Sequence, residues 1–388
     1  MTTVRPADRL LQVSEYYFSK KLEQIRQMRA SGSDVINLGI GSPDLFPVGT
    51  AVNAAVTSLQ SEKSHGYASS RSTPELRKAM ADWYARTYKV NVDPASQVLP
   101  LLGSKEGILY LSLAFLNPGD QVLIPNPGYP AYSSVASLIG AQPVYYDLCE
   151  GGEWYPDLED LNKRDLSRCK LMWVNYPHMP TGKRASAEVF KNIIEFGREK
   201  NILICNDNPY GLVLNREAPL SLLTQDPGLE VGVELNSLSK SFNMAGWRVG
   251  MILASKVVID AVLQVKSNVD SGMFLPIQAG AIAALEVDES WHLGRNEVYR
   301  ERRKIVWSIF DQLGFHYDRE QVGLFVWAKA PESVLDVEGF VDQLLDRSHV
   351  FLTPGFIFGT QGRGYARASL CAPVEVLREA LHRLGGQP

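Results

Sequence analysis

The chain has 388 residues, 45% of them hydrophobic, and a net charge of −4, which is ordinary for a water-soluble globular protein. No clustered basic face, signal-peptide core or apolar run of membrane-spanning length is present, so we expect no nucleic-acid or membrane partner. The four cysteines form no C-x-x-C pair, so we expect reduced thiols in a cytoplasmic protein. The six histidines lack metal-ligand spacing, so no metal is expected.

The first predicted elements are an amphipathic helix over residues 16–30, followed by a strand over residues 34–41. Through the middle of the chain, short apolar runs alternate with helical patterns such as residues 186–200. The runs lie at residues 121–125, 170–176, 201–206 and 250–253. Short, continuously apolar runs are typical of strands buried on both faces of a parallel sheet. The alternation predicts an α/β layered domain.

The last quarter of the chain has a different pattern. It begins with a long charged helix from about residue 291 and ends with a helix over residues 374–384. Short strands are predicted between these helices, over residues 324–329 and 366–370. The two ends of the chain are therefore expected to form one structural unit separate from the middle.

We expect a larger α/β domain over residues 49–290. The head of the chain, residues 1–48 with an N-terminal arm, and the tail, residues 291–388, would meet as a smaller α+β domain. Boundaries drawn from sequence patterns carry an uncertainty of a few residues.

Residues 237–250, SLSKSFNMAGWRVG, place Lys240 in a turn rich in small and hydroxyl side chains, followed by Arg248. A lysine amine can condense with an aldehyde to form a Schiff base. Arg248, with Ser237 alongside, offers charge-assisted hydrogen bonds to a phosphate. Aldehyde and phosphate on one small molecule describe pyridoxal 5′-phosphate (PLP). The alternative for this segment alone is a surface loop with a solvated lysine and arginine.

Two further segments fit a bound cofactor. Residues 102–107, LGSKEG, open an apolar helix whose free N–H groups can bind an anion, although Ser104 could be a simple helix cap. Residues 125–132, PNPGYPAY, hold Tyr129 in a rigid loop, where it could stack on a heteroaromatic ring or pack on the sheet.

Two charged residues complete the pattern. Asp207, in CNDNPYG, follows an apolar strand and could pair with a protonated pyridine nitrogen, or form an Asx-turn instead. Tyr210, three residues on, could donate to the phenolate oxygen of the ring. Arg367, on a predicted strand near the tail, could bind a substrate carboxylate through two parallel hydrogen bonds, or lie on a solvated strand.

In order and type these motifs resemble the fold-type I PLP enzymes, specifically the class I/II aminotransferases, from about residue 16 onward. The resemblance implies a large PLP-binding α/β domain with a mainly parallel sheet flanked by helices, plus a smaller α+β domain. It implies that Lys240 is the Schiff-base lysine and proton shuttle, Asp207 the partner of the ring nitrogen, and Tyr210 the partner of the phenolate oxygen.

The resemblance also implies the remaining contacts of the cofactor and substrate. Tyr129 matches the ring-stacking aromatic, and Gly41 and Arg367 match the groups that hold the α-carboxylate. Tyr67 matches a tyrosine that reaches the phosphate of the neighbouring subunit, which implies a homodimer with shared active sites. The phosphate-binding set comprises Gly103, Ser104, Lys105, Ser237 and Arg248.

One position departs from the family pattern. The stretch NYPHMPTG places Met179 where the family has an asparagine that hydrogen-bonds the phenolate oxygen. A methionine cannot donate a hydrogen bond. Either His178 or Asn175 compensates, or the site functions with one contact fewer.

The function implied is amino transfer between an L-amino acid and a 2-oxo acid, with 2-oxoglutarate the expected acceptor, by a ping-pong mechanism. The head of the chain looks most like the branch that contains LL-diaminopimelate aminotransferases. One alternative is a PLP-dependent C–S β-lyase on the same fold. A PLP-binding regulatory module is disfavoured, because the chain has neither spare length nor a basic recognition helix.

Overall fold

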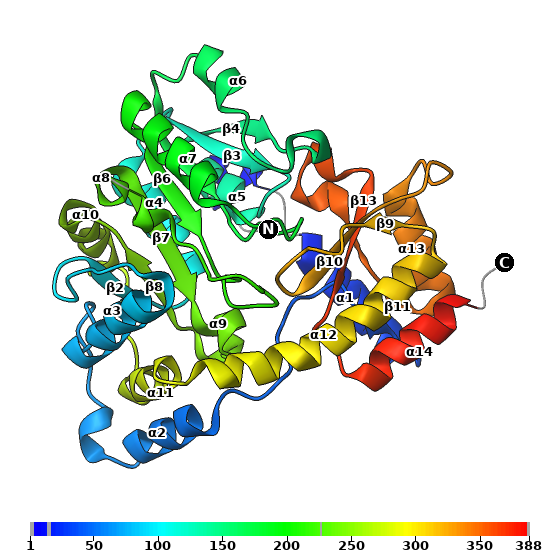
Figure 1. Ribbon diagram of the computed structural model, residues 1–388, viewed down its shortest axis with the longest axis horizontal. Coiled ribbons are helices and arrows are strands. Elements are labelled where there is room, and N and C mark those ends of the chain that lie inside the picture. Colours follow the sequence, from blue (N-terminus) through cyan, green and yellow to red (C-terminus); the bar gives the residue numbers. More distant parts are fainter. Residues whose placement is uncertain (1–3, 14–16, 226, 386–388) are drawn as a thin grey trace.

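The computed structural model describes residues 4–13, 17–225 and 227–385. A larger part is built on a seven-stranded sheet and a smaller part on a four-stranded sheet. The long helix α12 (Glu289–Gln312) runs from one part to the other along the lower side of the view in Figure 1. The predicted start of the first helix at Tyr16 lies outside the described residues, and α1 covers Tyr17–Ala30.

The large sheet has the strand order β2-β8-β7-β6-β5-β3-β4. Its strands are β2 Val98–Leu101, β3 Gln121–Asn126, β4 Gln142–Asp147, β5 Cys169–Val174, β6 Leu203–Asp207, β7 Gly232–Ser237 and β8 Gly250–Leu253. Neighbours pair in parallel from β7 to β4, which agrees with the predicted mainly parallel sheet.

Strand β8 is the correction to that prediction. The apolar run at residues 250–253 does form a strand, but it runs antiparallel to both β2 and β7. The connection from β7 contains only the short α9 (Leu238–Ser241) and the 3₁₀ turn Ala245–Trp247. The two ends of this connection stay side by side, since the N–H of Leu238 donates to the Val249 carbonyl at 3.1 Å and Ser237 pairs with Gly250, so the chain re-enters the sheet at the edge it left.

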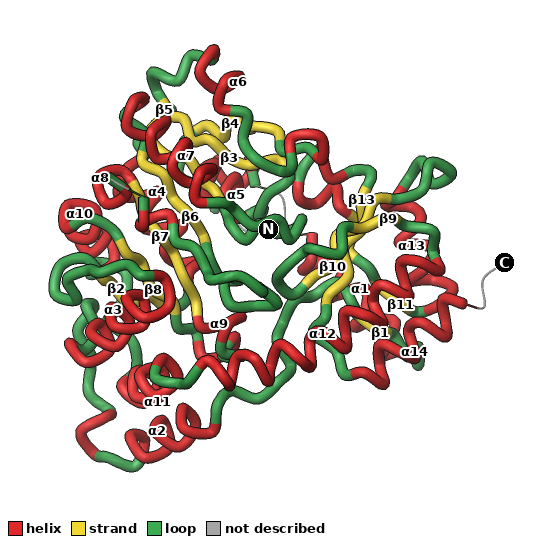
Figure 2. Tube along the Cα trace, viewed as in Figure 1, coloured by secondary structure: helices red, strands yellow, loops and turns green. Residues whose placement is uncertain are grey.

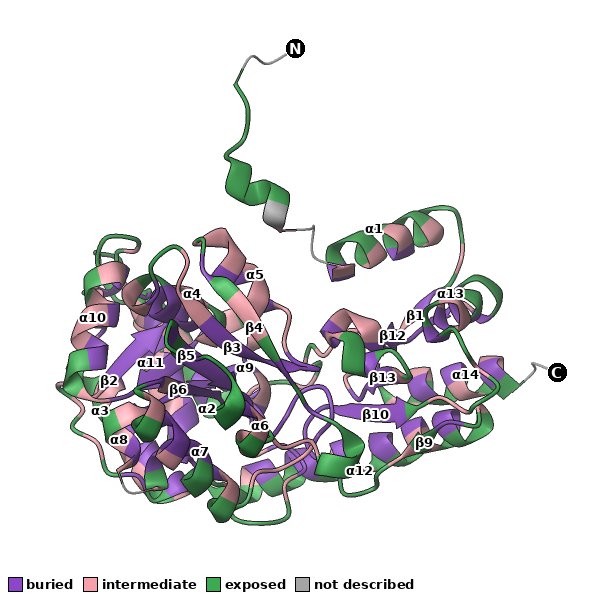
Figure 3. Cartoon of the chain, turned by 90° about the horizontal axis from the view of Figure 1, so that it is seen from above, coloured by how far each residue is buried: buried purple, intermediate pink, exposed green. Residues whose placement is uncertain are grey.

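Both faces of the large sheet are buried. In β5, Leu171 and Trp173 pack into the core on one face, and Met172 and Val174 pack into the core on the other. Helices flank the strands in Figure 2, and the strands are the most deeply buried layer in Figure 3. The helices of this part are α2 Gly49–Leu59, α3 Pro74–Tyr88, α4 Ser104–Phe115, α5 Ala131–Leu138, α6 Leu158–Lys163, α7 Ala187–Lys200, α8 Gly228–Val231, α10 Lys256–Lys266 and α11 Leu275–Leu285.

The smaller part combines both ends of the chain. Its antiparallel sheet has the order β12-β13-β10-β9, and β1 pairs in parallel with β11. The elements are β1 Ile36–Asn37, β9 His316–Tyr317, β10 Phe325–Lys329, α13 Val337–Ser348, β11 Val350–Phe351, β12 Thr353–Pro354, β13 Tyr365–Ser369 and α14 Val374–Gly385. The strand predicted over residues 34–41 is thus much shorter. The domain boundaries proposed at residues 49 and 291 stay a prediction.

None of the helices in the described part of the chain is both long and apolar enough to cross a membrane. The same residues contain no group of histidine, cysteine and acidic side chains suited to a metal ion.

Candidate active site

Three strand ends meet at one edge of the large sheet. Strands β2 and β7 both run antiparallel to β8. Their last residues, Leu101 and Ser237, both pair with Gly250, the first residue of β8. Strand β6 is parallel to β7, so Asp207 at its end reaches the same edge. Ligands of open α/β sheets bind outside the carboxyl ends of the strands. The sheet topology therefore places the candidate residues at a position suited to ligand binding.

A cavity of about 380 Å³ opens at this edge. All but two of the predicted site residues line it, and they come from both sheets and the loops around them. These residues are Gly41, Ser104, Lys105, Tyr129, Asp207, Tyr210, Ser237, Lys240, Arg248 and Arg367. The two exceptions are Gly103, which lies against Arg248, and Tyr67. The structure thus brings together residues that are far apart in the sequence, while their individual roles stay predictions.

One end of the cavity is built around Arg248 and the start of α4. Gly103 has a φ of +90°, and a Cβ at this position would lie 2.1 Å from Nη2 of Arg248. Glycine is therefore required both by the backbone conformation and by the approach of the guanidinium. Arg248 donates from Nη1 to the Ala245 carbonyl at 2.9 Å. Together with Lys105 and the first N–H groups of α4, this end is suited to a phosphate.

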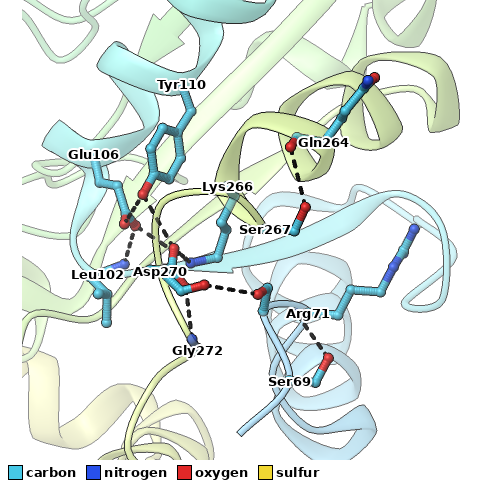
Figure 4. Close-up of polar contacts among 11 residues, drawn as sticks. Ser69, Arg71, Leu102, Glu106, Tyr110, Gln264, Lys266, Ser267, Asp270 and Gly272 are labelled. Carbon is cyan, nitrogen blue, oxygen red and sulfur yellow. Dashed lines mark hydrogen bonds and ion pairs between the residues drawn. The ribbon is translucent and has the colours of Figure 1, made fainter.

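A buried polar network holds the start of α4 in place (Figure 4). The Glu106 carboxylate accepts from the backbone N–H of Leu102 at 2.6 Å and from the Tyr110 hydroxyl at 2.8 Å. The same hydroxyl contacts Asp270 at 3.2 Å, and the buried ammonium of Lys266 donates to Asp270 at 2.6 Å. The network ties the turn that precedes α4 to the C-terminal end of α10. The proposed phosphate site therefore rests on a helix start that is fixed from behind.

Of the residues that the structure describes, Asp207 is the one acid that lines the cavity. Its Oδ2 accepts from the Tyr132 hydroxyl at 3.1 Å, while its Oδ1 is buried and has no hydrogen-bond partner among the described residues. Burial raises the pKa of Asp207 to about 7, and the hydrogen bond from Tyr132 partly opposes this rise. A buried carboxylate oxygen without a partner calls for a cationic or N–H donor.

Lys240 lies in the short helix α9, and its ammonium donates to the carbonyl of Gly41 from the other end of the chain. Burial lowers the pKa of Lys240, and the positive charges of Arg367 and Arg248 lower it further against an opposing effect of Cys371. A lysine with a depressed pKa is neutral more often at neutral pH. It is therefore better able to act as a nucleophile and as a base.

Arg367 lies at the end of the cavity formed by the smaller part. It is buried on β13, and its guanidinium lies over the ring of Phe325 at 3.8 Å and that of Phe358 at 4.6 Å. Its Nη2 donates to the Gly39 carbonyl at 2.9 Å. A Cβ on Gly41 would lie 2.1 Å from the Phe325 ring, so the chain needs glycine there. These contacts fix the plane of the guanidinium, which is what bidentate binding of a carboxylate requires.

Met179 faces the cavity and contacts Arg367, whose Nη1 lies 3.1 Å from the methionine sulfur. Of the two residues considered as substitutes for the missing asparagine, Asn175 lines the cavity. Its Nδ2 donates to the carbonyl of Asp207, and its Oδ1 accepts from the N–H of Met179 at 2.9 Å. His178 is not among the residues that line the cavity, and its Nδ1 shares a hydrogen bond with Thr181. Asn175 is thus the better-placed substitute.

The described residues fit PLP. Asp207 offers a buried oxygen for a protonated ring nitrogen, and Lys240 offers an amine for the aldehyde. The charged residues that line the cavity are Asp207 and four cations, Lys105, Lys240, Arg248 and Arg367. This excess of positive charge suits a ligand with a phosphate and a substrate with a carboxylate.

Sequence reasoning missed several residues of the site. Tyr132 holds Asp207 through its hydroxyl, and its ring stacks on Trp173 at 4.9 Å. Its position three residues after Tyr129 is a signal that could have been followed, since such spacing places two side chains on neighbouring positions of a helix start. Phe18 and Phe325 line the cavity without any such signal, because an isolated phenylalanine is far more often a core residue.

Tyr67 does not join the cavity within one chain. Its side chain is 94% exposed, on the loop between α2 and α3. Aromatic residues are enriched at protein–protein interfaces relative to the rest of the protein surface. Its predicted role in a neighbouring subunit is compatible with this position and stays a prediction.

Comparison with known proteins gives consistent matches along the whole chain. The family model for aminotransferase class I and II matches residues 33–384. The chain is 39% identical over 381 residues to LL-diaminopimelate aminotransferase of Desulforudis audaxviator, which covers 98% of this chain and 97% of that protein. The structure of apo-BacF from Bacillus subtilis matches with a TM-score of 0.95 and 34% identity, over 99% of this chain and 98% of that one. A Thermus thermophilus aspartate aminotransferase mutant matches with a TM-score of 0.90 and 25% identity, over 99% of both chains.

The raised pKa of Asp207 predicts a pH dependence of stability in the protein without its cofactor. An aspartate with an ordinary pKa of 3.8 in the unfolded chain and about 7 in the folded chain keeps its proton longer when folded. Stability is therefore lost as the pH rises from about 4 through 7. Between pH 5 and pH 8 we expect Asp207 to lower the free energy of unfolding by roughly 2 kcal/mol. Asp207→Asn removes this contribution.

The measurement is urea unfolding at both pH values for the wild type and Asp207→Asn. Buried His178 and His292, whose pKa values are lowered by burial to about 3, contribute a trend of opposite sign to both proteins and cancel in the difference. Asp147→Asn, which removes an exposed carboxylate from the end of β4 at the same sheet edge, serves as the control. An identical pH profile in the wild type and Asp207→Asn would contradict the assignment.

Proposed function

The chain belongs to the aminotransferase class I and II family of PLP enzymes, and we propose that it moves the amino group of an L-amino acid to 2-oxoglutarate by a ping-pong mechanism. The observation that supports this is the partly buried Lys240, which shares one cavity with Asp207 and with two arginines, Arg248 and Arg367, whose charges both lower its pKa. Arg248 comes from the loop that precedes β8 of the large sheet, and Arg367 comes from β13 of the small sheet. Such a cavity can hold a phosphate and a carboxylate at the same time.

The donor that we propose to test first is LL-diaminopimelate. Six relatives named LL-diaminopimelate aminotransferase match almost the full length of this chain at 36–39% identity. The branch resemblance of the head of the chain points to the same donor. The side-chain preference depends on the walls of the cavity and needs a panel of donors.

Each residue has a proposed part in the reaction. When bound, PLP supplies an aldehyde that takes up the amino group and a ring that accepts the electrons left when the Cα–H bond breaks. Asp207 keeps the ring nitrogen protonated, and Tyr132 holds the carboxylate in place. Tyr129 would stack on the ring and Tyr210 would donate to its oxygen. Tyr129 and Tyr210 both line the cavity.

Lys240 is the proposed general base. Its amine would take the proton from Cα of the substrate and return it on the cofactor side, since the depressed pKa favours the neutral amine that this step needs. Arg367 would hold the α-carboxylate against the backbone near Gly41, so that the Cα–H bond stays within reach of Lys240. The first product leaves as a 2-oxo acid before the acceptor enters.

We further propose a homodimer with shared sites, in which Tyr67 of one subunit contacts the phosphate in the other. The exposure of this side chain and its distance from the cavity of its own chain support the proposal. Gly272 lies against the backbone of the same loop, where a Cβ would come within 2.5 Å of the Ser69 carbonyl. The loop that carries Tyr67 therefore has a defined support and can present the side chain to a partner.

Amino transfer is tested by product stoichiometry. With an amino donor and 2-oxoglutarate, we expect one glutamate for each oxo acid formed. We expect loss of turnover in Lys240→Ala, because the other lysine of the cavity, Lys105, lies at the proposed phosphate end. Lys256→Ala, which removes an exposed lysine outside the cavity, is the control and should retain wild-type turnover. Oxo acid and ammonia without glutamate would instead indicate an eliminating enzyme such as a C–S β-lyase. Wild-type turnover in Lys240→Ala would rule out the proposed base.

Arg367→Lys should reduce kcat/KM for every amino-acid donor at least about tenfold. Lysine keeps the charge but loses the planar fork, and a hydrogen bond to a charged group contributes roughly 1.5–3 kcal/mol, where 1.4 kcal/mol is a factor of ten. A plain amine without a carboxylate should be almost unaffected. Arg363→Lys, at an exposed position near the start of the same strand, is the control. A loss of kcat/KM confined to donors with one class of side chain would show that Arg367 recognises the donor side chain instead of its carboxylate.

Shared sites predict opposite results for two arrangements of the same lesions in tagged heterodimers. With Lys240→Ala on one chain and Tyr67→Ala on the other, one site is intact and the other carries both lesions, so activity should recover to about half of the wild type. With both lesions on one chain and a wild-type partner, each site carries one lesion, and activity should stay low. The reverse outcome would place Tyr67 in the site of its own subunit.

A further inference from the structure

Helix α12 carries three buried arginines, and two of them have well-defined partners. Arg302 forms a bidentate ion pair with Asp44, at 2.6 and 2.8 Å. Arg295 donates to the carbonyls of Ser241 and Leu212. Burying a charge costs several kcal/mol unless an opposite charge or a full set of hydrogen bonds compensates it. Arg302 is compensated by this carboxylate, and Arg295 in part by its hydrogen bonds, while the Nε atoms of both lack a hydrogen-bond partner among the described residues.

Arg303 has the fewest hydrogen bonds of the three among the described residues. It is 4% exposed, and no carboxylate of the described residues lies within 4.0 Å of its guanidinium. Its Nη1 donates to the Gln321 carbonyl at 2.8 Å and its plane lies over Trp307 at 4.9 Å, but its Nε is buried without a hydrogen-bond partner among those residues. Burial lowers the pKa of Arg303, and the charge of Arg216 lowers it further. The negative charge of Glu320, which lines the same cavity, opposes these two effects.

Arg303 lies in a second cavity of about 70 Å³, outside the active site. Four arginines, Arg184, Arg216, Arg303 and Arg319, line it together with two glutamates. Of the two glutamates, Glu217 is already paired with Arg184 at 2.7 Å, which leaves Glu320 beside the other three arginines. Since a water needs roughly 10–15 Å³, the cavity has room for a small polyatomic ion. We propose that this cavity is a binding site for a small oxyanion such as phosphate, held by the guanidinium groups of Arg303, Arg216 and Arg319.

Guanidinium groups favour such a ligand over a monatomic ion, because their planar N–H forks match pairs of oxygens. Arg303 provides the buried end of the cavity, while Arg216 and Arg319 are exposed and can adjust to the ligand. The site is distinct from the active cavity, since the two share no lining residue. It does not depend on the amino-transfer activity.

The location gives the oxyanion a structural consequence. Three segments meet at this cavity, and backbone hydrogen bonds join them: Val322 donates to Gly182 and Gly323 to Val213, each at 2.9 Å. Each segment also carries, within three residues, a side chain that lines the active cavity. These side chains are Met179, Tyr210 and Phe325. A bound oxyanion would therefore hold together the seam between the larger and the smaller part behind the active site.

The test is thermal unfolding of the PLP-loaded enzyme in sodium phosphate and in sodium chloride at equal ionic strength. The loaded enzyme is required because its own phosphate site is filled, and absorbance of the bound cofactor checks that loading is unchanged. At phosphate concentrations near ten times Kd, the midpoint of the wild type should rise by about 2 °C above its value in chloride. The variant Arg216→Gln/Arg319→Gln should lose this rise, and both positions are exposed, so folding should be retained.

Arg198→Gln/Arg378→Gln is the matched control, because it removes two exposed arginines elsewhere on the surface and leaves the active cavity intact. It should respond to phosphate as the wild type does, including any response that arises at Arg367. An equal rise in all three proteins would overturn the proposal, as would the absence of any rise in the wild type.

Discussion

The structure depends first on how the strands of the large sheet end. Because β6 and β7 are parallel and β2 is related to β7 through the antiparallel β8, their carboxyl ends share one edge. This constraint brings the start of α4, Asp207 and Lys240 together although about 140 residues of chain separate the first from the last. Antiparallel β8 has its own part in this arrangement, because a strand that begins at this edge delivers Arg248 there just before its first residue. A parallel β8 would have placed that arginine's neighbour Gly250 at the opposite edge.

Charge is the second organising feature of the site. Among the described residues, four cations and one carboxylate line the active cavity, so the protein without ligand holds like charges around one cavity. The depressed pKa of Lys240 and the raised pKa of Asp207 share burial as their main cause, and both shifts favour neutral forms. A bound cofactor with a cationic ring nitrogen would instead favour the charged form of Asp207. The same arrangement that makes the site costly without a ligand makes it selective for one.

Sequence patterns predicted most of this architecture, and the parts they missed have physical reasons. Continuous apolar runs identified β3, β5, β6 and β8 because strands buried on both faces have little polar content. The direction of β8 could not be read from its residues, since both orientations bury the same side chains. The strand predicted over residues 34–41 shrank to Ile36–Asn37 because pairing with β11 ends there, and the carbonyl of Leu38 instead accepts from the N–H of Ser369 in β13.

For the site, sequence motifs marked residues that carry chemistry, and missed those that position them. Lys240, Asp207 and Arg248 lie in distinctive glycine-, serine- or proline-containing turns. The residues behind them, such as Tyr132 and Glu106, lie in ordinary helical sequence, and their contacts depend on distant parts of the chain.

Met179 departs from the family pattern, and its place in the site is understood only when the sequence and the structure are considered together. A thioether sulfur is a weak acceptor, so its contact with Arg367 keeps the guanidinium oriented, and a substrate carboxylate could replace it at little cost. The methionine therefore fits the proposed carboxylate-binding role of Arg367, and Asn175 remains in place to supply a polar contact with the cofactor.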